Sequence, residues 1–255
     1  MTASRAPDSS AVPAWRRTLR YWIARVAVSI LVRVYVRVHV EGGERLPAGP
    51  AIYCFNHLGW LDPFVLMAVL PMRPRLYFFG PKEVDMRAGA RNRVMSWTGT
   101  PIPFRPEKDD LLRVTRRVQA VLAGGAVMAI AGEGRIHASE SELWPLNEGT
   151  AYFALRSSVD IVPIAINGTS WLHFRARIRV RVGEPLAVAG RPDREAVAAL
   201  TRRTWTALHG MVRDAPKVAE PGPFGRWLTE RFNEWPEGSR DATRAAGAAH
   251  SSSDD

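Results

Sequence analysis

The sequence predicts an α/β fold with a largely parallel central sheet flanked by helices. Apolar runs of strand length alternate with segments of helical periodicity through the middle of the chain, a pattern typical of this class. Two of the runs, 51–55 and 126–131, are apolar without alternation, as expected for strands covered on both faces. With 255 residues, of which 46% are hydrophobic, the chain is long enough for a substantial core.

The N-terminal part of the chain predicts a disordered tail over residues 1–13 and an amphipathic helix over residues 14–33. Apolar side chains recur in the helix at spacings of three and four, at Trp15, Leu19, Trp22, Ile23, Val26 and Ile30. Arginines lie among them, at Arg16, Arg17, Arg20 and Arg25. We expect the helix to lie in a membrane interface, with core packing as the common alternative for an amphipathic helix.

The best candidate for a membrane span, residues 21–40, does not have the pattern of one. Arg25, Arg33 and Arg37 interrupt it, and a charge at the bilayer centre costs at least ~2.5 kcal/mol. We therefore expect a peripheral or monotopic protein on the cytoplasmic face of the cell membrane.

Residues 34–235 predict the α/β domain, and the small, polar residues 236–255 predict a second disordered tail. The expected strands are 34–41, 51–55, 76–79, 102–104, 126–131, 161–167 and 177–182. The expected helices are 63–70, 85–98, 108–123, 149–157 and 193–213, followed by an aromatic stripe over 224–235. We expect 177–182 to be an edge strand because it alternates, Pro163 to mark a strand start or edge, and the aromatic stripe to pack in the core.

Composition narrows the function classes. The net charge is +10 and comes almost entirely from arginine, whose planar fork of donors suits phosphate. Such a balance points to nucleic acid, an anionic membrane or an anionic substrate, and a genomic bias toward arginine gives the same composition. The arginines are dispersed and no nucleic-acid motif is present, so we expect no nucleic-acid partner. The single cysteine, Cys54, excludes an internal disulfide and a cysteine-based zinc cluster.

The segment 56–62 places a histidine and an aspartate directly after a buried strand. His57 leaves the carboxyl end of that strand, where α/β sheets bind ligands. Asp62 precedes Pro63 and an apolar helix, as an N-cap would, but one of its two oxygens can also accept the ring N–H of His57. Because a buried Cys54 thiol is inert, His57 would act directly on an acceptor hydroxyl as general base. On spacing alone, an incidental loop histidine and a helix cap remain alternatives.

Three further segments follow predicted strands or contain one. Arg105 follows a short strand, and a surface charge is the alternative. In the loop Gly132-Glu133-Gly134-Arg135, glycines allow a ligand close to the backbone and Arg135 can grip a phosphate, while a turn with a surface ion pair is the alternative. The segment 161–168 contains Val162-Pro163-Ile164 and is by itself a buried strand with a turn.

In this order, the four segments resemble the glycerolipid acyltransferase family, typified by 1-acyl-sn-glycerol-3-phosphate acyltransferase. Asn56-His57 with Asp62 is similar to the family's His-x4-Asp block, and Arg105 falls where its second block ends in arginine. Glu133-Gly134-Arg135 resembles the Pro-Glu-Gly-Thr-Arg block, and 162–164 resembles the Val-Pro block. The resemblance covers about residues 34–185.

The resemblance implies a reaction of phospholipid biosynthesis. His57 would deprotonate the hydroxyl of a lysophospholipid such as lysophosphatidic acid, which attacks the thioester of acyl-CoA or acyl-carrier protein. Asp62 would orient His57. The expected substrate-binding residues, which together shape the acceptor site and hold its phosphate, are Arg105, Glu133, Gly134 and Arg135. No metal or other cofactor is implied, and the expected partners are the two substrates and an anionic membrane surface.

The third block departs from the family pattern, because it lacks the aromatic and proline before Glu133 and the threonine before Arg135. This departure motivates a second hypothesis, in which the same chemistry serves a glycolipid or an amino-acid lipid. A third hypothesis, a non-catalytic basic membrane-binding protein, rests on the charge and on the arginine-rich helix, and it predicts no need for His57.

Overall fold

The computed structural model describes residues 13–82, 90–104 and 111–233, and it contains one seven-stranded sheet. The strands are β1 (Arg37–Glu41), β2 (Ile52–Phe55), β3 (Leu76–Lys82), β4 (Pro101–Phe104), β5 (Val127–Ala131), β6 (Ile161–Asn167) and β7 (Arg177–Val182). Their order across the sheet is β1-β7-β6-β2-β5-β3-β4, and each neighbouring pair is parallel except β6 with β7.

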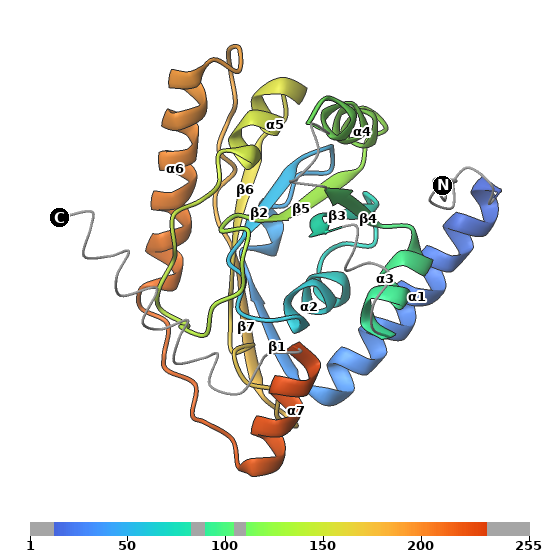
Figure 1. Ribbon diagram of the computed structural model, residues 1–255, viewed down its shortest axis with the longest axis vertical. Helices are drawn as coiled ribbons and strands as arrows, with labels where there is room; N and C mark the ends of the chain where they lie inside the picture. The colour runs from blue at the N-terminus through green and yellow to red at the C-terminus, as the bar shows by residue number, and fades with distance from the viewer. Residues whose placement is uncertain (1–12, 83–89, 105–110, 234–255) are drawn as a thin grey trace, which may run out of the picture.

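Helices cover both faces of this sheet (Figure 1). They are α1 (Ala14–Tyr35), α2 (Leu61–Val69), α3 (Ala90–Thr98), α4 (Leu111–Ala123), α5 (Gly149–Ser157), α6 (Arg194–Val212) and α7 (Pro223–Asn233), with a short 3-10 turn, η2 (Gly43–Arg45). Buried side chains of α1, α2 and α3 belong to the core on one face, and those of α4, α5 and α6 to the core on the other. The predicted α/β class with a largely parallel sheet is confirmed.

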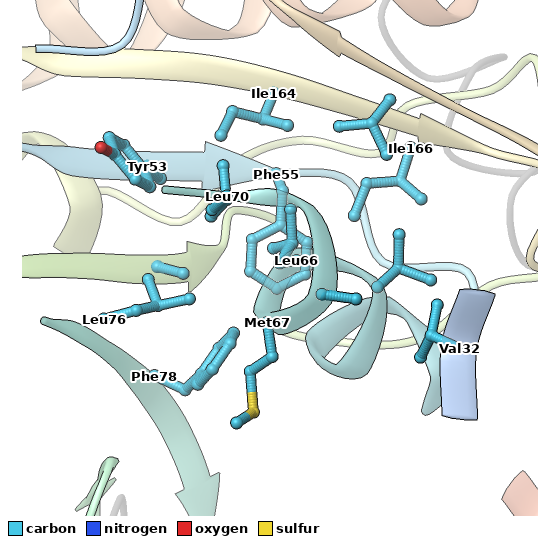
Figure 2. Close-up of a cluster of buried hydrophobic side chains, with 14 of the residues drawn as sticks. Val32, Tyr53, Phe55, Leu66, Met67, Leu70, Leu76, Phe78, Ile164 and Ile166 are labelled. Carbon is cyan, nitrogen blue, oxygen red and sulfur yellow. The ribbon is translucent and has the colours of Figure 1, made fainter. Parts of the chain in front are cut away.

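The alternation of side chains along β2 divides the core into these two layers. Tyr53 and Phe55 face α2, as Figure 2 shows, whereas Ile52 and Cys54 belong to the layer under α5 and α6. All four side chains are at most 3% exposed. The strand is therefore covered on both faces, as its unbroken apolar sequence predicts, and the chain reaches the surface only beyond Phe55.

Two predictions about the sheet were wrong. β7 is not an edge strand, because β1 pairs with its free side, and β1 itself forms the edge. The alternating pattern arises because one face of β7 is buried while its arginines are largely exposed. Pro163 lies in an interior strand, and it is tolerated there because the pairing of β6 with β7 begins only at Ile164.

Helix α1 extends further than predicted, to Tyr35, so that Val34 is helical and β1 starts at Arg37. Val32 and Val36 are buried at a spacing of four, and packing of this kind overrides the β-preference of valine. No helix in the described part of the chain combines the length and apolar character needed to cross a bilayer.

The expected division of α1 into an apolar and an arginine-bearing side was also wrong at Arg25. This side chain is fully buried, and it donates to the Tyr21 hydroxyl at 3.0 Å and to the carbonyl oxygens of Leu70 and Pro71 at 2.5 and 2.9 Å. It therefore ties α1 to the end of α2. Large apolar residues between 48% and 67% exposed occupy the outer side of the helix: Trp15, Leu19, Ile23, Val26, Ile30, Leu31 and Val34.

The aromatic stripe near the C-terminus forms α7, but it does not pack as predicted. Phe224 and Trp227 are 72% and 57% exposed, whereas Leu228 and Phe232 are half-buried. Trp235 lies outside the described residues. The helical spacing was predicted correctly, but spacing alone does not tell which turn of the stripe meets the core.

Candidate active site

The site is built at the carboxyl end of β2, where Asn56 fixes the direction of the chain. The Asn56 side chain donates from Nδ2 to the carbonyl of Ile166 at 2.8 Å and accepts from the Ile166 N–H at 2.7 Å. It is fully buried and continues the pairing of β2 with β6 by one more rung. The next residue, His57, therefore leaves the sheet from a rigid position.

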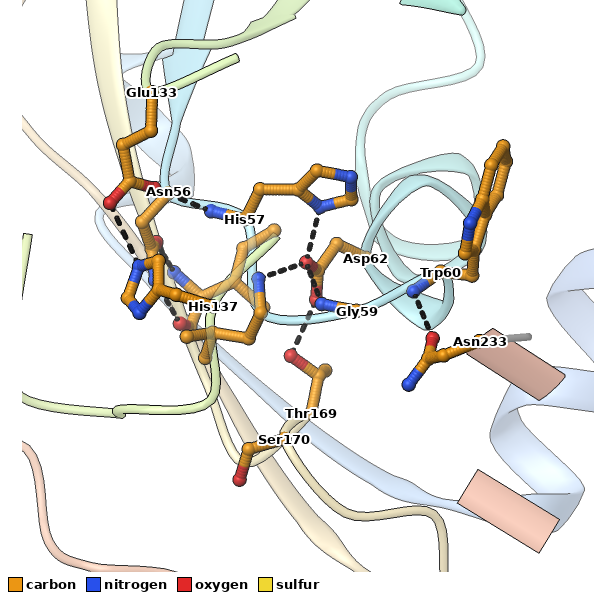
Figure 3. A network of polar contacts seen from close by, with 12 residues as sticks. Asn56, His57, Gly59, Trp60, Asp62, Glu133, His137, Thr169, Ser170 and Asn233 are labelled. Carbon is orange, nitrogen blue, oxygen red and sulfur yellow. Dashed lines mark hydrogen bonds and ion pairs between the residues drawn. The ribbon is translucent and has the colours of Figure 1, made fainter. Parts of the chain in front are cut away.

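The His57 ring points toward Asp62, as Figure 3 shows, and its Nδ1 lies 2.8 Å from Asp62 Oδ2. The same oxygen accepts the N–H groups of Leu58 and Gly59, at 2.7 and 3.0 Å. The Asp62 side chain is fully buried, whereas that of His57 is 16% exposed. A carboxylate held in this way fixes the ring with its proton on Nδ1 and leaves Nε2 to face an acceptor.

The interpretation of Asp62 as an N-cap was wrong in detail. The helix begins at Leu61, so Trp60 is the cap residue and Asp62 lies inside the first turn. Its carboxylate reaches back to the loop that precedes the helix, because the N–H groups of that loop converge on one point. The contact with the His57 ring, which the sequence predicted, is present.

Thr169 completes the surroundings of Asp62 and was missed from the sequence. Its hydroxyl donates to Asp62 Oδ1 at 2.5 Å, so both carboxylate oxygens have donors. Thr169 lies two residues beyond the end of β6, the neighbour of β2 in the sheet. A hydroxyl in that position would have been a candidate had the strand order been known.

Glu133 lies on the other side of His57 and holds its backbone. One carboxylate oxygen accepts the His57 N–H at 3.0 Å, and the other accepts the Trp144 N–H at 2.8 Å. The His57 carbonyl accepts the backbone N–H of His137 at 3.1 Å. The buried His137 ring has Nε2 2.8 Å from Glu133 Oε1, without the angles of a hydrogen bond. The loop after β5 therefore holds both backbone polar groups of His57.

The remaining predicted substrate-binding residues lie in the same loop or outside the described residues. Gly134 has a φ of +68°, and an added Cβ would lie 2.3 Å from Asn147 Nδ2, so both conformation and space favour glycine. Arg135 is exposed, and its guanidinium carbon lies 4.6 Å from the centre of the Trp144 ring. The structure thus brings His57, Asp62 and Glu133 together. Arg105 lies outside the described residues.

Among the residues that the structure describes here, Cys54 is no thiol nucleophile and no metal cluster is formed. Burial raises the pKa of Cys54 to about 12, so the thiol stays protonated at neutral pH. Gly132 packs directly on it, because a Cβ there would lie 2.8 Å from Sγ. Within the described ranges, no three His, Cys, Asp or Glu side chains form a group that could hold a metal ion.

A second layer of polar contacts fixes the loop that carries Thr169. The buried Glu140 carboxylate accepts the N–H groups of Gly168 and Ser170, at 2.8 and 3.1 Å. Burial raises the pKa of Glu140, against the opposing effect of these hydrogen bonds. From α7, Asn233 accepts the N–H of Trp60 at 2.8 Å. Segments far apart in the sequence therefore converge on the loop between β2 and α2.

This chain is similar in sequence and in fold to known acyltransferases. The chain is 26% identical over 157 residues to the chloroplastic 1-acyl-sn-glycerol-3-phosphate acyltransferase of Arabidopsis thaliana, and 25% identical to that of Brassica napus. The matches cover 61% of this chain but 43% and 44% of the relatives, so the chain spans less than half of their length. The crystal structure of a 1-acyl-sn-glycerophosphate acyltransferase from Thermotoga maritima has the same fold, with a TM-score of 0.57 at 15% identity over 82% of this chain and 84% of that one.

The family profile named acyltransferase matches residues 37–167, which include β1, the whole 56–62 loop, and the 132–135 loop. This match spans half of the chain and contains the residues of all four segments on which the resemblance rests, 56–62, Arg105, 132–135 and 162–164. The protein belongs to the acyltransferase family.

Proposed function

We propose that this chain transfers a fatty acyl group from a thioester donor to a hydroxyl of lysophosphatidic acid or a related lysophospholipid, with His57 as general base. The observation that carries the proposal is the His57–Asp62 pair at the carboxyl end of a central parallel strand. Its geometry presents Nε2 to an acceptor, and the relatives named above are acyltransferases on 1-acyl-sn-glycerol-3-phosphate.

In the proposed reaction, the acceptor hydroxyl gives its proton to His57 Nε2 as its oxygen attacks the thioester carbonyl. The buried Asp62 carboxylate stabilises the positive charge that the ring then acquires. The tetrahedral intermediate collapses by breaking the carbon–sulfur bond, and the departing thiolate takes the proton back from His57. Because the Cys54 thiol is protonated and buried, its properties favour direct transfer over an acyl-enzyme.

Glu133 and Arg135 take different parts in this proposal. Both carboxylate oxygens of Glu133 accept backbone N–H groups, so the carboxylate shapes the site by holding the His57 backbone. Arg135 is exposed, with its guanidinium over the Trp144 ring, and an exposed guanidinium suits a group that binds the phosphate of the acceptor. Gly134 lets the loop turn between them, and Arg105 is proposed as a second phosphate ligand.

We further propose that the outer side of α1 docks on an anionic membrane surface, where the acceptor resides. Seven large apolar side chains are exposed there, and exposed apolar patches of this kind mark interaction sites. The exposed arginines Arg16, Arg17 and Arg33 on the same helix suit anionic headgroups. The exposed side of α1 supports peripheral attachment, and the cytoplasmic face of the cell membrane is part of the same proposal.

The test of the acceptor is a transfer assay with palmitoyl-CoA and a panel of lipids in mixed vesicles. The panel contains lysophosphatidic acid, lysophosphatidylglycerol, a phosphate-free glycolipid and an amino-acid lipid. We expect acylated product from lysophosphatidic acid, with the release of one thiol per product. Transfer to the glycolipid or the amino-acid lipid alone would overturn the phosphate-bearing acceptor and leave the reaction class intact.

A further inference from the structure

A second concave surface lies on the β1–β7 edge of the sheet, apart from the His57 site. It is an open pocket of about 490 Å³, and its lining includes Arg37, His39, Arg177, Arg179, Gly168 and Pro216. Four of these side chains are basic, and they come from two neighbouring strands. No function described above uses any of them.

The pocket opens on the face of the sheet opposite α1. Ile178 and Val180 belong to the core layer that α1 and α2 cover. Because side chains alternate across a strand, Arg177 and Arg179 project to the other face, where α6 lies (Figure 1). If α1 rests on a membrane, the pocket therefore faces away from the bilayer and takes a ligand from solution.

Basic side chains face each other in this pocket. Arg37 pairs in register with Arg177, and His39 with Arg179, on strands that run parallel. Neighbouring strands are about 4.8 Å apart, and like charges placed opposite each other destabilise the pair. Glu41 offsets part of the charge, since its carboxylate lies 2.7 Å from Arg179 Nε and 3.6 Å from His39 Nε2.

Arg37 and Arg177 lack such an offset. Among the described residues, no acidic side chain forms an ion pair with either of them. The acids of the adjoining loop have arginine partners of their own, Asp214 with Arg213 at 3.3 Å and Glu220 with Arg226 at 2.7 Å. Two guanidinium groups in one pocket, without a counter-charge among the described residues, form a site for an external anion.

We infer that this pocket binds the phosphate groups of a soluble nucleotide. On the proposed function, on which this assignment rests, the nucleotide is the 3′-phosphorylated adenosine diphosphate portion of the acyl-CoA donor. Paired guanidinium forks bind phosphate through two parallel hydrogen bonds each. The pantetheine arm separates the nucleotide from the thioester, so the two need not bind in one place.

The position of the pocket along the chain agrees with this assignment. Gly168 lines it, and the next residue, Thr169, donates to Asp62. Asn167 also lines the pocket, and its Nδ2 donates to the carbonyl of Glu140, whose carboxylate holds the same loop. The loop that ends β6 therefore forms a wall between the pocket and the carboxylate beside His57.

The test is calorimetric titration of the full chain with adenosine 3′,5′-bisphosphate, with adenosine as the uncharged comparison. The variant is Arg37→Gln with Arg177→Gln, which keeps most of each side chain and removes its charge. The matched control is Arg202→Gln with Arg203→Gln, two exposed arginines of α6. We expect the bisphosphate to bind the native chain and to bind the pocket variant at least about 10-fold more weakly, with the control unchanged. Coenzyme A should bind more tightly than its dephospho form.

Two results would overturn the inference: equal affinity of the bisphosphate for the native chain and the pocket variant, or equal affinity of adenosine and the bisphosphate for the native chain. Thermal melting without ligand is a second check. Because the variant removes a like-charge pair, it should melt no lower than the native chain, and a lower melting temperature would mean that these arginines are engaged within the chain. The titration measures binding without turnover. If the chain transfers acyl groups but fails this test, the inference about the pocket is wrong and the proposed function stands.

Discussion

The loop that carries His57 and the outer side of α1 are stabilised in very different ways. In the loop, the buried Asp62 carboxylate has donors on both oxygens, and the backbone of His57 is held on its N–H and on its carbonyl. On α1, seven large apolar side chains lie at the surface with about half or more of their area exposed. The first arrangement is complete within the chain, whereas the second needs a partner to cover it.

Because of this difference, we expect the His57 loop to control the rate of the chemical step and the outer side of α1 to control membrane binding. A preorganised loop fixes the reacting groups before the substrate binds, so changes there should reduce the rate of the chemical step. Changes on the exposed apolar side of α1 should instead alter the fraction of protein bound to membranes, and with it the concentration of lipid substrate near the site. Each prediction below tests one side of the comparison.

Among the residues that surround His57, the largest effect is expected at Asp62. Asp62→Asn replaces the charge that stabilises the protonated His57 ring and places an NH2 group among N–H donors, so kcat should fall by roughly 10²–10⁴. Asp214→Asn, on an exposed aspartate paired with Arg213, is the matched control and should keep full activity. Steady-state kinetics measures both. A tenfold or smaller loss in Asp62→Asn would mean that the pair does not act as proposed.

A smaller effect is expected at Thr169. Thr169→Val removes one donor from a buried carboxylate, and a hydrogen bond to a charged group contributes enough to slow the reaction about 10-fold or more. Thr169→Ser keeps the donor and should restore most of the rate. We expect the loss in kcat, with KM nearly unchanged, and a shift in the pH profile of kcat. A loss confined to KM would indicate a contact with substrate instead.

Substitutions on the outer side of α1 should weaken membrane binding. Ile23→Ser, Val26→Ser and Ile30→Ser together should weaken sedimentation with anionic liposomes at least about 10-fold, because each side chain would lose its burial in lipid. These three residues are preferable to a deletion of α1, since that would also remove the buried Tyr21. Leu111→Ser with Leu112→Ser, on exposed residues of α4, is the control. Equal binding of all three proteins would exclude α1 as the docking surface.

The smallest effect concerns the pH dependence of stability through Glu140. Burial raises the pKa of this carboxyl in the folded chain, so its contribution to stability is fully present below the unfolded pKa, about 4.3, and is lost as pH rises through the folded pKa. The free energy of unfolding of the native chain minus that of Glu140→Gln should therefore decrease from pH 4 to pH 8. Urea titrations measure it, with the exposed Glu142→Gln as control. An increase over this range would contradict the stated sign.

The two sides of the comparison also differ in how far the sequence predicts them. His57 and Asp62 are five residues apart, and a buried strand followed by an apolar helix places both at one sheet edge. Thr169 and Glu133 reach the same loop from 107 and 76 residues away. They reach the loop because β2 lies between β5 and β6 in the sheet. Local sequence patterns do not predict the order of strands, so these two contacts could not be predicted.

Helix α1 could be predicted as a helix but not oriented. Apolar side chains lie on both its buried and its exposed sides, so periodicity does not identify the inner one. Arg25 makes the inner side of α1 harder to identify. An arginine is expected at the surface, but this one is buried against carbonyl oxygens at the end of α2. The edge assignment of β7 failed for a related reason, since its alternation reports an exposed face and not an exposed edge.

The central claim is that His57 is the base of an acyl transfer. Its most direct test compares His57→Ala with His209→Ala, a half-buried histidine stacked on Trp205 of α6, in transfer from palmitoyl-CoA to lysophosphatidic acid. Both variants should melt close to the native chain. We predict that His57→Ala loses roughly 10²–10⁴ in rate while His209→Ala keeps full activity. Transfer by His57→Ala at the native rate would contradict the account.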